Sequence, residues 1–253
     1  MKFGIEHIVG HRGAKLNAPE NSLGGFEYLR SLGIHKVELD VQLSRDGHAV
    51  VFHDHNLGRL CNLDGHICDY DVTELQSMNC AVNFPGWHPI EPIPTLERVL
   101  SAWPELTHIQ IEVKTPTKAS QAQAAISALL NQIKTLVKFY QLERVAVITA
   151  KSMRVLELNL NTGKICAQGL VYEPPQLPGE ANPITLAQSL KCEYLMPYYP
   201  LVNAQMAHEA KDQNLTLSTW TVNDLNTARS LIEEVHLNSI ITDNVHNMLE
   251  FVS

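Results

Sequence analysis

The chain of 253 residues lacks the features of several common protein classes. No stretch approaches the roughly 18 apolar residues of a membrane-spanning helix, so we expect no integral membrane segment. The residues after Met1 lack the apolar core of a secretory signal. Acidic residues outnumber basic ones, 27 to 19, which argues against nonspecific binding to nucleic acid or to an anionic membrane surface.

Cysteine is also sparse. The five cysteines are scattered, odd in number and without a C-x-x-C pair, so we expect reduced thiols in a cytoplasmic protein. Cys61 and Cys68 could form half a zinc site with His55 and His66, but unpaired cysteines in a loop-rich segment are the favoured interpretation.

Three catalytic motifs are missing as well. The sequence contains no G-x-S-x-G nucleophile elbow, which disfavours a serine hydrolase. It contains neither a G-x-G-x-x-G fingerprint nor a P-loop, which disfavours a nucleotide-binding fold.

Short runs rich in β-branched residues alternate with amphipathic stretches along the chain. The expected strands are Ile5–Gly10, Lys36–Leu43, His108–Lys114, Val145–Ala150, Ile165–Val171, Tyr194–Tyr198, Leu215–Thr221 and Ser239–Thr242. The expected helices are Ser22–Leu32, Leu96–Trp103, Ala119–Tyr140, Ser152–Leu160, Pro183–Leu190, Asn203–Gln213, Asp224–Glu234 and Val245–Phe251. This alternation predicts an α/β fold, a closed (β/α)₈ TIM barrel formed by one domain over residues 1–253, although periodicity alone also permits an open doubly wound sheet.

The rhythm breaks after the second of these strands. Residues 54–94 are rich in turn signals and too long for an ordinary barrel loop, so we expect a small insertion there. Its aromatic residues Phe84 and Trp87 could line a substrate pocket or merely pack the insertion onto the barrel.

Charged residues interrupt the apolar strands. Glu38 and Asp40 are two apart, so on a strand they point to one face, where a cation would relieve their repulsion. Glu112 would complete an all-oxygen site suited to Mg²⁺ or Ca²⁺. The alternative is that these carboxylates pair with Arg or Lys at a rim.

Histidines and basic residues accompany these carboxylates. His11 and His53 each end an apolar run and could supply a general acid and a general base, whereas a lone histidine in such a place is more often structural. Arg12 and Lys114 could bind a phosphate group, or could only neutralise the carboxylates.

Taken in order, these motifs carry a family resemblance that runs from about residue 8 to residue 245. The motifs are His11-Arg12-Gly13, Ala18-Pro19-Glu20-Asn21-Ser22, Glu38-Leu39-Asp40-Val41, Asp46-Gly47, Val50-Val51-Phe52-His53-Asp54, Ile93-Pro94-Thr95-Leu96-Glu97, Ile111-Glu112-Val113-Lys114, Trp220-Thr221-Val222-Asn223 and Ile240-Ile241-Thr242-Asp243. Their order resembles that of the glycerophosphodiester phosphodiesterase family.

The resemblance implies a TIM barrel with the insertion over its mouth and a place in lipid and glycerol metabolism. It implies hydrolysis of glycerophosphodiesters to glycerol 3-phosphate and an alcohol, with Glu38, Asp40 and Glu112 as ligands of one divalent cation, Mg²⁺ or Ca²⁺ with Mn²⁺ also suited. It further implies His11 and His53 as the acid–base pair.

Substrate contacts are implied too, with Arg12 and Lys114 at the phosphate and Trp220 lining the pocket; Trp220 could equally be simple barrel packing. Glu20 and Asn21 match the family motif and are read as organisers of the first loop. Two alternatives are a related barrel phosphodiesterase for lysophospholipids and a catalytically silent binding protein. The oligomeric state is left open by the sequence.

Overall fold

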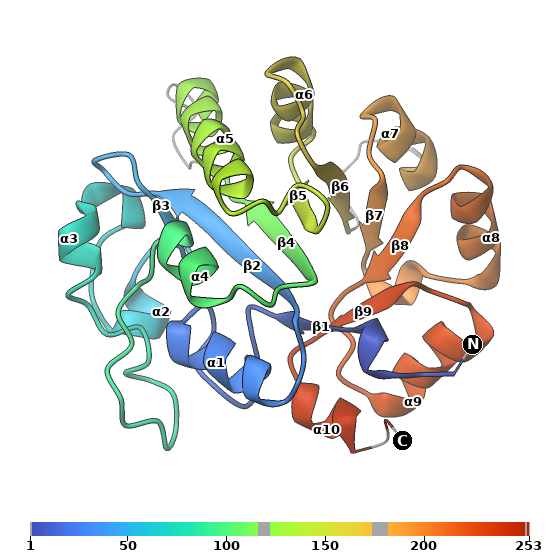
Figure 1. Cartoon of the computed structure of the whole chain (residues 1–253), viewed down its shortest axis with the longest axis horizontal. Helices are drawn as coiled ribbons and strands as arrows, with labels where there is room; N and C mark the ends of the chain where they lie inside the picture. The colour runs from blue at the N-terminus through green and yellow to red at the C-terminus, as the bar shows by residue number, and fades with distance from the viewer. Residues whose placement is uncertain (1, 116–121, 174–181, 251, 253) are drawn as a thin grey trace.

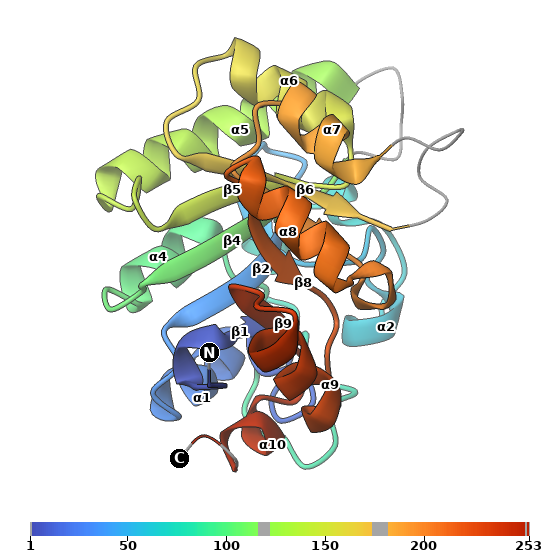
Figure 2. The same cartoon turned by 90° about the vertical axis from the view of Figure 1, so that its right-hand side faces the viewer.

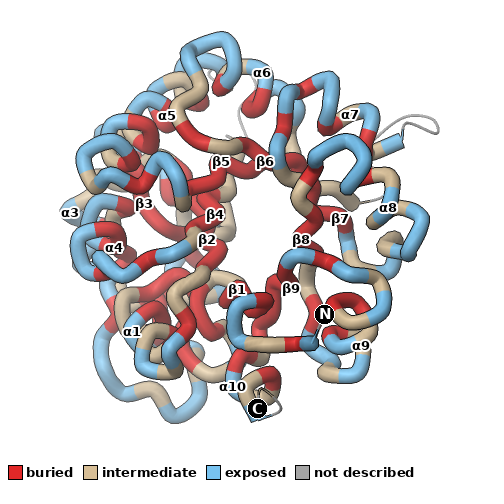
Figure 3. Tube along the Cα trace, turned by 45° about the vertical axis from the view of Figure 1, so that its right-hand side comes forward, coloured by how far each residue is buried: buried red, intermediate tan, exposed pale blue. Residues whose placement is uncertain are grey.

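Parallel strands of the chain close into a ring, as Figure 3 shows end on. The computed structural model describes residues 2–115, 122–173, 182–250 and 252. The strands of the ring are β1 (Ile8–His11), β2 (Lys36–Leu43), β4 (His108–Val113), β5 (Ala146–Ala150), β6 (Ala167–Tyr172), β7 (Tyr194–Pro197), β8 (Thr216–Thr219) and β9 (Ser239–Thr242). Each pairs in parallel with its neighbours, and β1 pairs with both β9 and β2. This closure confirms the predicted TIM barrel and excludes the open sheet.

Helices cover the outside of the ring (Figures 1 and 2). They are α1 (Leu23–Ser31), α4 (Leu96–Ala102), α5 (Ala122–Phe139), α6 (Met153–Asn161), α7 (Pro183–Ser189), α8 (Ala204–Asp212), α9 (Leu225–Arg229) and α10 (Val245–Leu249). Ser22 caps α1 by accepting a hydrogen bond from the Gly25 N–H, and Thr95 caps α4 in the same way from Arg98. None of the helices in the described ranges has both the length and the apolar character needed to cross a membrane.

Two expected elements differ from the observed ones. Ile5–His7 forms a 3₁₀ turn (η1) instead of the start of a strand, because the His7 N–H donates to the Gly4 carbonyl and the Gly4 N–H to His7 Nδ1. The expected helix over 224–234 divides into α9 and a π-helical segment, Ser230–Glu234, in which the Val235 N–H reaches the Ser230 carbonyl. The expected start of α5 at 119–121 lies outside the described residues.

The segment after β2 forms a separate small lobe (Figures 1 and 2). The strand β3 (Ala49–Val51) runs antiparallel to β2, followed by α2 (Gly58–Cys61), a 3₁₀ turn over Ile67–Asp69 and α3 (Val72–Leu75). The lobe has its own apolar cluster, made of Val50, Phe52, Leu57, Cys61, Ile67, Leu75, Cys80 and Ile93. Burial in this cluster raises the pKa of the Cys61 thiol to about 11, whereas Cys68 is exposed. Within the described ranges neither cysteine joins a cluster of metal-ligand type.

The register of the parallel strands places the polar residues. His11 lies opposite Glu38 across β1 and β2, and Asp40 lies opposite Glu112 across β2 and β4. Because side chains alternate along a strand, Glu38 and Asp40 share one face and meet Glu112 there. The barrel therefore gathers these groups on adjacent strands, toward the carboxyl end where active sites of this fold lie.

Candidate active site

Three carboxylates from two neighbouring strands converge. One carboxylate oxygen from each of Glu38, Asp40 and Glu112 lies within 4.8 Å of the others. Glu38 and Asp40 are buried and Glu112 is partly buried. The sequence prediction of an acidic triad thus corresponds to a real cluster with only oxygen donors, which suits a hard divalent cation.

The electrostatics of this cluster suit a bound cation. Burial, reinforced by the charges of Asp40 and Glu112, raises the pKa of Glu38 well above its usual range. Its Oε1 atom is buried and receives no hydrogen bond from the described part of the chain. An unsatisfied buried carboxylate oxygen is costly, and a cation placed among the three groups would satisfy it.

Two cations flank the triad. Lys114 Nζ lies 2.7 Å from both Asp40 and Glu112, and Arg12 Nε lies 3.2 Å from Asp40. Burial by itself raises the pKa of Asp40, but the charges of Lys114 and Arg12 outweigh it and hold this pKa well below its usual range. Arg12 and Lys114 thus form ion pairs with the triad, and their contact with a phosphate group stays a prediction.

The imidazole of His11 is held by a carboxylate. Its Nδ1 lies 2.6 Å from Asp243 Oδ1, and its Nε2 lies 3.9 Å from Glu38. Because an ionised carboxylate only accepts, Nδ1 carries the proton and the Nε2 lone pair faces the triad. Burial lowers the pKa of His11 more than the Asp243 hydrogen bond raises it, so the ring is neutral at neutral pH.

His53, which follows β3 at the start of the insertion, is also held by a carboxylate. Its Nδ1 lies 2.7 Å from Asp54 Oδ1. Gln42, on the same face of β2 as Asp40, donates hydrogen bonds to the carbonyls of Phe52 and Asp54. The backbone around His53 is therefore fixed directly to the strand that carries two of the acidic residues.

A chain of ion pairs ties the insertion to the triad. Arg59 in α2 makes two 2.7 Å hydrogen bonds to the Glu20 carboxylate and another of 2.7 Å to Asp54. Glu20 also accepts a 2.9 Å hydrogen bond from Arg12, which contacts Asp40. Glu20 thus organises the first loop as expected from the sequence, and Asn21 does likewise by donating to Asp40.

Four residues of this site were missed by the sequence prediction as site residues. Asp243 and Asp54 both belong to the family motifs named above. Asp243 directly follows an expected strand and Asp54 directly follows His53, and these positions were the available signal. Gln42 lies two residues after Asp40 and therefore faces the same side of the strand as Glu38 and Asp40, so side-chain alternation could have identified it. Arg59 offered no signal, because it acts through a contact 39 residues away.

Trp220 lies just past β8, on the other side of the barrel mouth. Its Nε1 donates to the Met196 carbonyl, and Lys151 Nζ lies 4.6 Å from its ring centre. The ring of Tyr198 packs 5.8 Å away. The indole is held in place by these contacts, with its face beside a cation.

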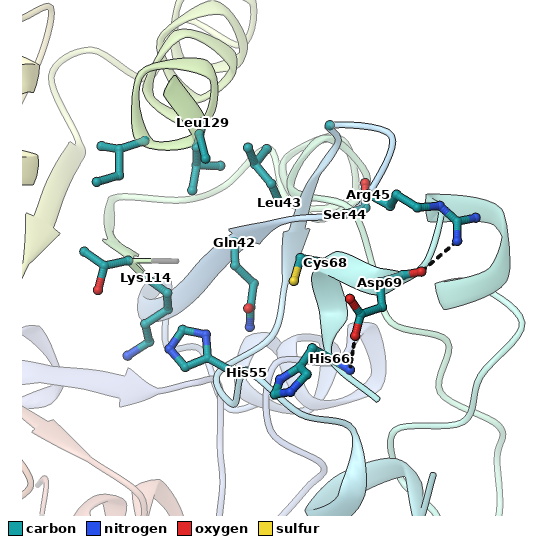
Figure 4. A pocket seen from close by; sticks show the side chains of 14 residues that line it. Gln42, Leu43, Ser44, Arg45, His55, His66, Cys68, Asp69, Lys114 and Leu129 are labelled. Carbon is teal, nitrogen blue, oxygen red and sulfur yellow. Dashed lines mark hydrogen bonds between the residues drawn. The ribbon is translucent and has the colours of Figure 1, made fainter. Parts of the chain in front are cut away.

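A pocket of about 260 Å³ opens beside Lys114, between the end of β2, the insertion and the first turns of α5 (Figure 4). Neither Phe84 nor Trp87 is among the residues that line it. Trp87 donates to Glu91, which also accepts a 3.0 Å hydrogen bond from the Gly24 N–H at the start of α1. Through these contacts Trp87 helps to join the insertion to the barrel.

The fold and the site together define a TIM-barrel enzyme. Its site contains three carboxylates that suit a divalent cation and two histidines that are each held by a carboxylate. Residues 11–247 match the model of the glycerophosphoryl diester phosphodiesterase family. The chain belongs to this family and is a phosphoric diester hydrolase.

Relatives and solved structures agree with this assignment. A glycerophosphodiester phosphodiesterase of Caldanaerobacter subterraneus subsp. tengcongensis is 26% identical over 97% of both chains. A crystal structure of a putative glycerophosphoryl diester phosphodiesterase from Silicibacter pomeroyi superposes with a TM-score of 0.87 at 21% identity, covering 97% of this chain and 92% of that one. An Oleispira antarctica phosphodiesterase, solved with the product sn-glycerol-3-phosphate, gives a TM-score of 0.82 at 21% identity, covering 96% and 95%.

Proposed function

We propose that this single-domain barrel hydrolyses glycerophosphodiesters to glycerol 3-phosphate and an alcohol in a reaction that requires one divalent cation. The observation that carries the proposal is the acidic triad, in which the buried Glu38 Oε1 has no hydrogen-bond partner among the described residues, beside two histidines that are each oriented by a carboxylate. Nothing in the site favours a silent binding protein, because all three acidic residues and both histidines are in place.

Glu38, Asp40 and Glu112 would hold the cation, and Mg²⁺, Ca²⁺ and Mn²⁺ all suit these oxygen donors. When bound, such an ion polarises phosphoryl oxygens and makes a coordinated water more acidic. Arg12 and Lys114 lie beside the triad and would supply positive charge for the phosphate. Trp220 would cover the apolar side of the glycerol unit.

The histidines would move protons. One Nε2 accepts the proton of the attacking water, or of the substrate's own glycerol hydroxyl if a cyclic phosphate forms, and the other imidazole delivers a proton to the leaving alcohol. His11 and His53 are both held through Nδ1, which leaves Nε2 of each available for this exchange.

Metal omission with a product assay tests the proposed activity. Exhaustive chelation is expected to abolish release of glycerol 3-phosphate from glycerophosphocholine, and Mg²⁺, Ca²⁺ or Mn²⁺ to restore it. Full turnover by protein shown to be free of metal would exclude the proposal. A long-chain lysophospholipid in the same assay tests the alternative substrate.

Substitution of each histidine tests the acid–base assignment. His11→Ala and His53→Ala should each lower turnover by roughly 10²–10⁴-fold while metal affinity stays close to that of the unchanged protein. A substrate whose alcohol has a low pKa should partly rescue the variant that lacks the general acid, which identifies that residue. A variant that keeps more than about a tenth of the turnover would remove its histidine from the mechanism.

A further inference from the structure

The pocket beside Lys114 has a distinct composition (Figure 4). One wall is aliphatic and comes from the end of β2 and from α5, and its residues are Leu43, Ala125, Ile126 and Leu129. The facing wall comes from the insertion and contains His55, His66, Cys68 and Asp69. A cleft with an apolar wall and a few polar groups facing it is typical of small-molecule subsites.

Lys114 connects this pocket with the catalytic cluster. Its side chain lines the pocket, and its Nζ lies 2.7 Å from Asp40 and from Glu112. His55 stands next to Lys114 in Figure 4, and burial together with the charge of Lys114 lowers its pKa, so its ring is neutral. Lys114 thus borders both the triad and the pocket, so the pocket adjoins the place where a phosphodiester would bind.

The lining carries two basic side chains and one carboxylate, so its charges do not by themselves select a cationic head group. Lys114 stands at the inner end, and Arg45 at the rim is paired with Asp71 and Glu74. Asp69 accepts a hydrogen bond from the His66 backbone N–H. Among the described residues the lining includes no Phe, Tyr or Trp, so this part of the chain offers no aromatic cage for a quaternary ammonium group.

The two halves of the substrate also differ in polarity. The hydroxyl-bearing glycerol unit fits the polar mouth near Lys151 and Trp220 better than an aliphatic floor. We propose, resting on the function proposed above, that the pocket of Leu43, Ala125, Ile126 and Leu129 binds the leaving alcohol and selects uncharged alcohols that carry an alkyl group.

The test uses the whole metal-loaded enzyme and glycerophospho esters of ethanol, butanol and hexanol, with glycerophosphocholine as the cationic comparison. These straight-chain alcohols have nearly equal leaving-group pKa values, so chain length changes contact and not chemistry. The value of kcat/KM should rise roughly threefold to fourfold per added methylene until the pocket is filled. Ala125→Phe should fill the pocket and remove most of this dependence on chain length. If the phenylalanine prevents folding, Ala125→Leu is the second variant, and it should remove part of the dependence.

Ala124→Phe is the matched control, because Ala124 is exposed on the same helix and does not line the pocket. This variant should keep the full dependence on chain length. A flat series in the unchanged enzyme, or an equal dependence in stably folded Ala125→Phe and Ala124→Phe, would overturn the assignment. Selective loss of lysophosphatidylcholine hydrolysis in Ala125→Phe, with the alkyl series unaffected, would instead place a chain of the glycerol half in the pocket and would also overturn it. Absence of hydrolysis of every ester with Mg²⁺, Ca²⁺ or Mn²⁺ would refute the proposed function and the pocket assignment together, whereas the preceding outcomes refute only the latter.

Discussion

At the scale of single residues, Asp243 is expected to act on the reaction only through His11. Asp243→Asn should lower kcat by roughly 10²-fold or more, because an amide can hold the ring in the wrong tautomer. The Asp243 hydrogen bond raises the pKa of His11, so its loss should move the limb of the pH–rate profile that belongs to His11 to lower pH. The pH dependence of kcat/KM measures this shift. A uniformly lower profile with unmoved limbs would mean that Asp243 serves folding alone.

Glu38 illustrates a conflict between stability and function in one residue. Glu38→Gln removes a buried charge whose pKa is raised, and it keeps an acceptor for the 3.1 Å hydrogen bond from the Arg12 N–H. The metal-free variant should therefore be more stable at neutral pH, by roughly 1 kcal/mol, yet bind the cation more weakly. Denaturant unfolding and metal titration give the two quantities. Glu97→Gln, at an exposed position, provides a control of equal charge change. Lower stability of metal-free Glu38→Gln would contradict the expectation.

At the scale of elements, Glu91 fastens the insertion to the barrel. This buried carboxylate accepts hydrogen bonds from the Gly24 N–H and from Trp87 Nε1. Glu91→Ala leaves both donors unpaired and should destabilise the protein by roughly 1–3 kcal/mol, whereas Glu91→Gln keeps one acceptor and should cost less. Thermal or denaturant unfolding distinguishes the two variants. Equal stability of Glu91→Ala and the unchanged protein would show that the lobe is held by its other contacts.

The same scale explains what the sequence could predict. The helices and strands of the barrel mostly followed from periodicity, and the shared face of Glu38 and Asp40 followed from side-chain alternation on a strand. The π-helical segment after α9 could not be predicted, because one added residue in a turn leaves the apolar pattern of 224–234 almost unchanged. The contact between Arg59 and Glu20 depends on how the insertion folds back, which no local pattern encodes.

At the scale of the whole molecule, acid is expected to unfold the metal-free protein through a few carboxylates. The folded-state pKa values of Glu20, Asp40, Asp54 and Asp243 all lie below their ordinary values, that of Asp243 at about 2. A lowered carboxyl pKa contributes stability that is present above the unfolded pKa, about 4, and is lost as pH falls toward the folded value. Glu38 acts in the opposite sense, because its raised pKa favours the protonated form in the folded state.

Thermal unfolding between pH 6 and pH 3 measures this loss, and Tm should fall steadily below about pH 4. Arg59→Ala supplies the comparison, since Glu20 and Asp54 then lose a shared cationic partner. Its Tm should be lower at pH 6 and should change less with acidification. A Tm that is constant or higher at pH 3 would refute the assignment of these carboxylates.

The closure of the ring by β1 and β9 also bears on how the protein is made. His11 and Asp243 are 232 positions apart in the chain, yet they form one hydrogen bond of the site. A nascent chain on the ribosome cannot complete either the barrel or this pair until β9 has emerged, so the enzyme gains activity only after that point of synthesis. Contacts between segments so far apart in the chain also slow folding. Until β9 has paired, β1 and β8 each expose an unpaired strand edge, which is prone to aggregation and which chaperones would have to shield.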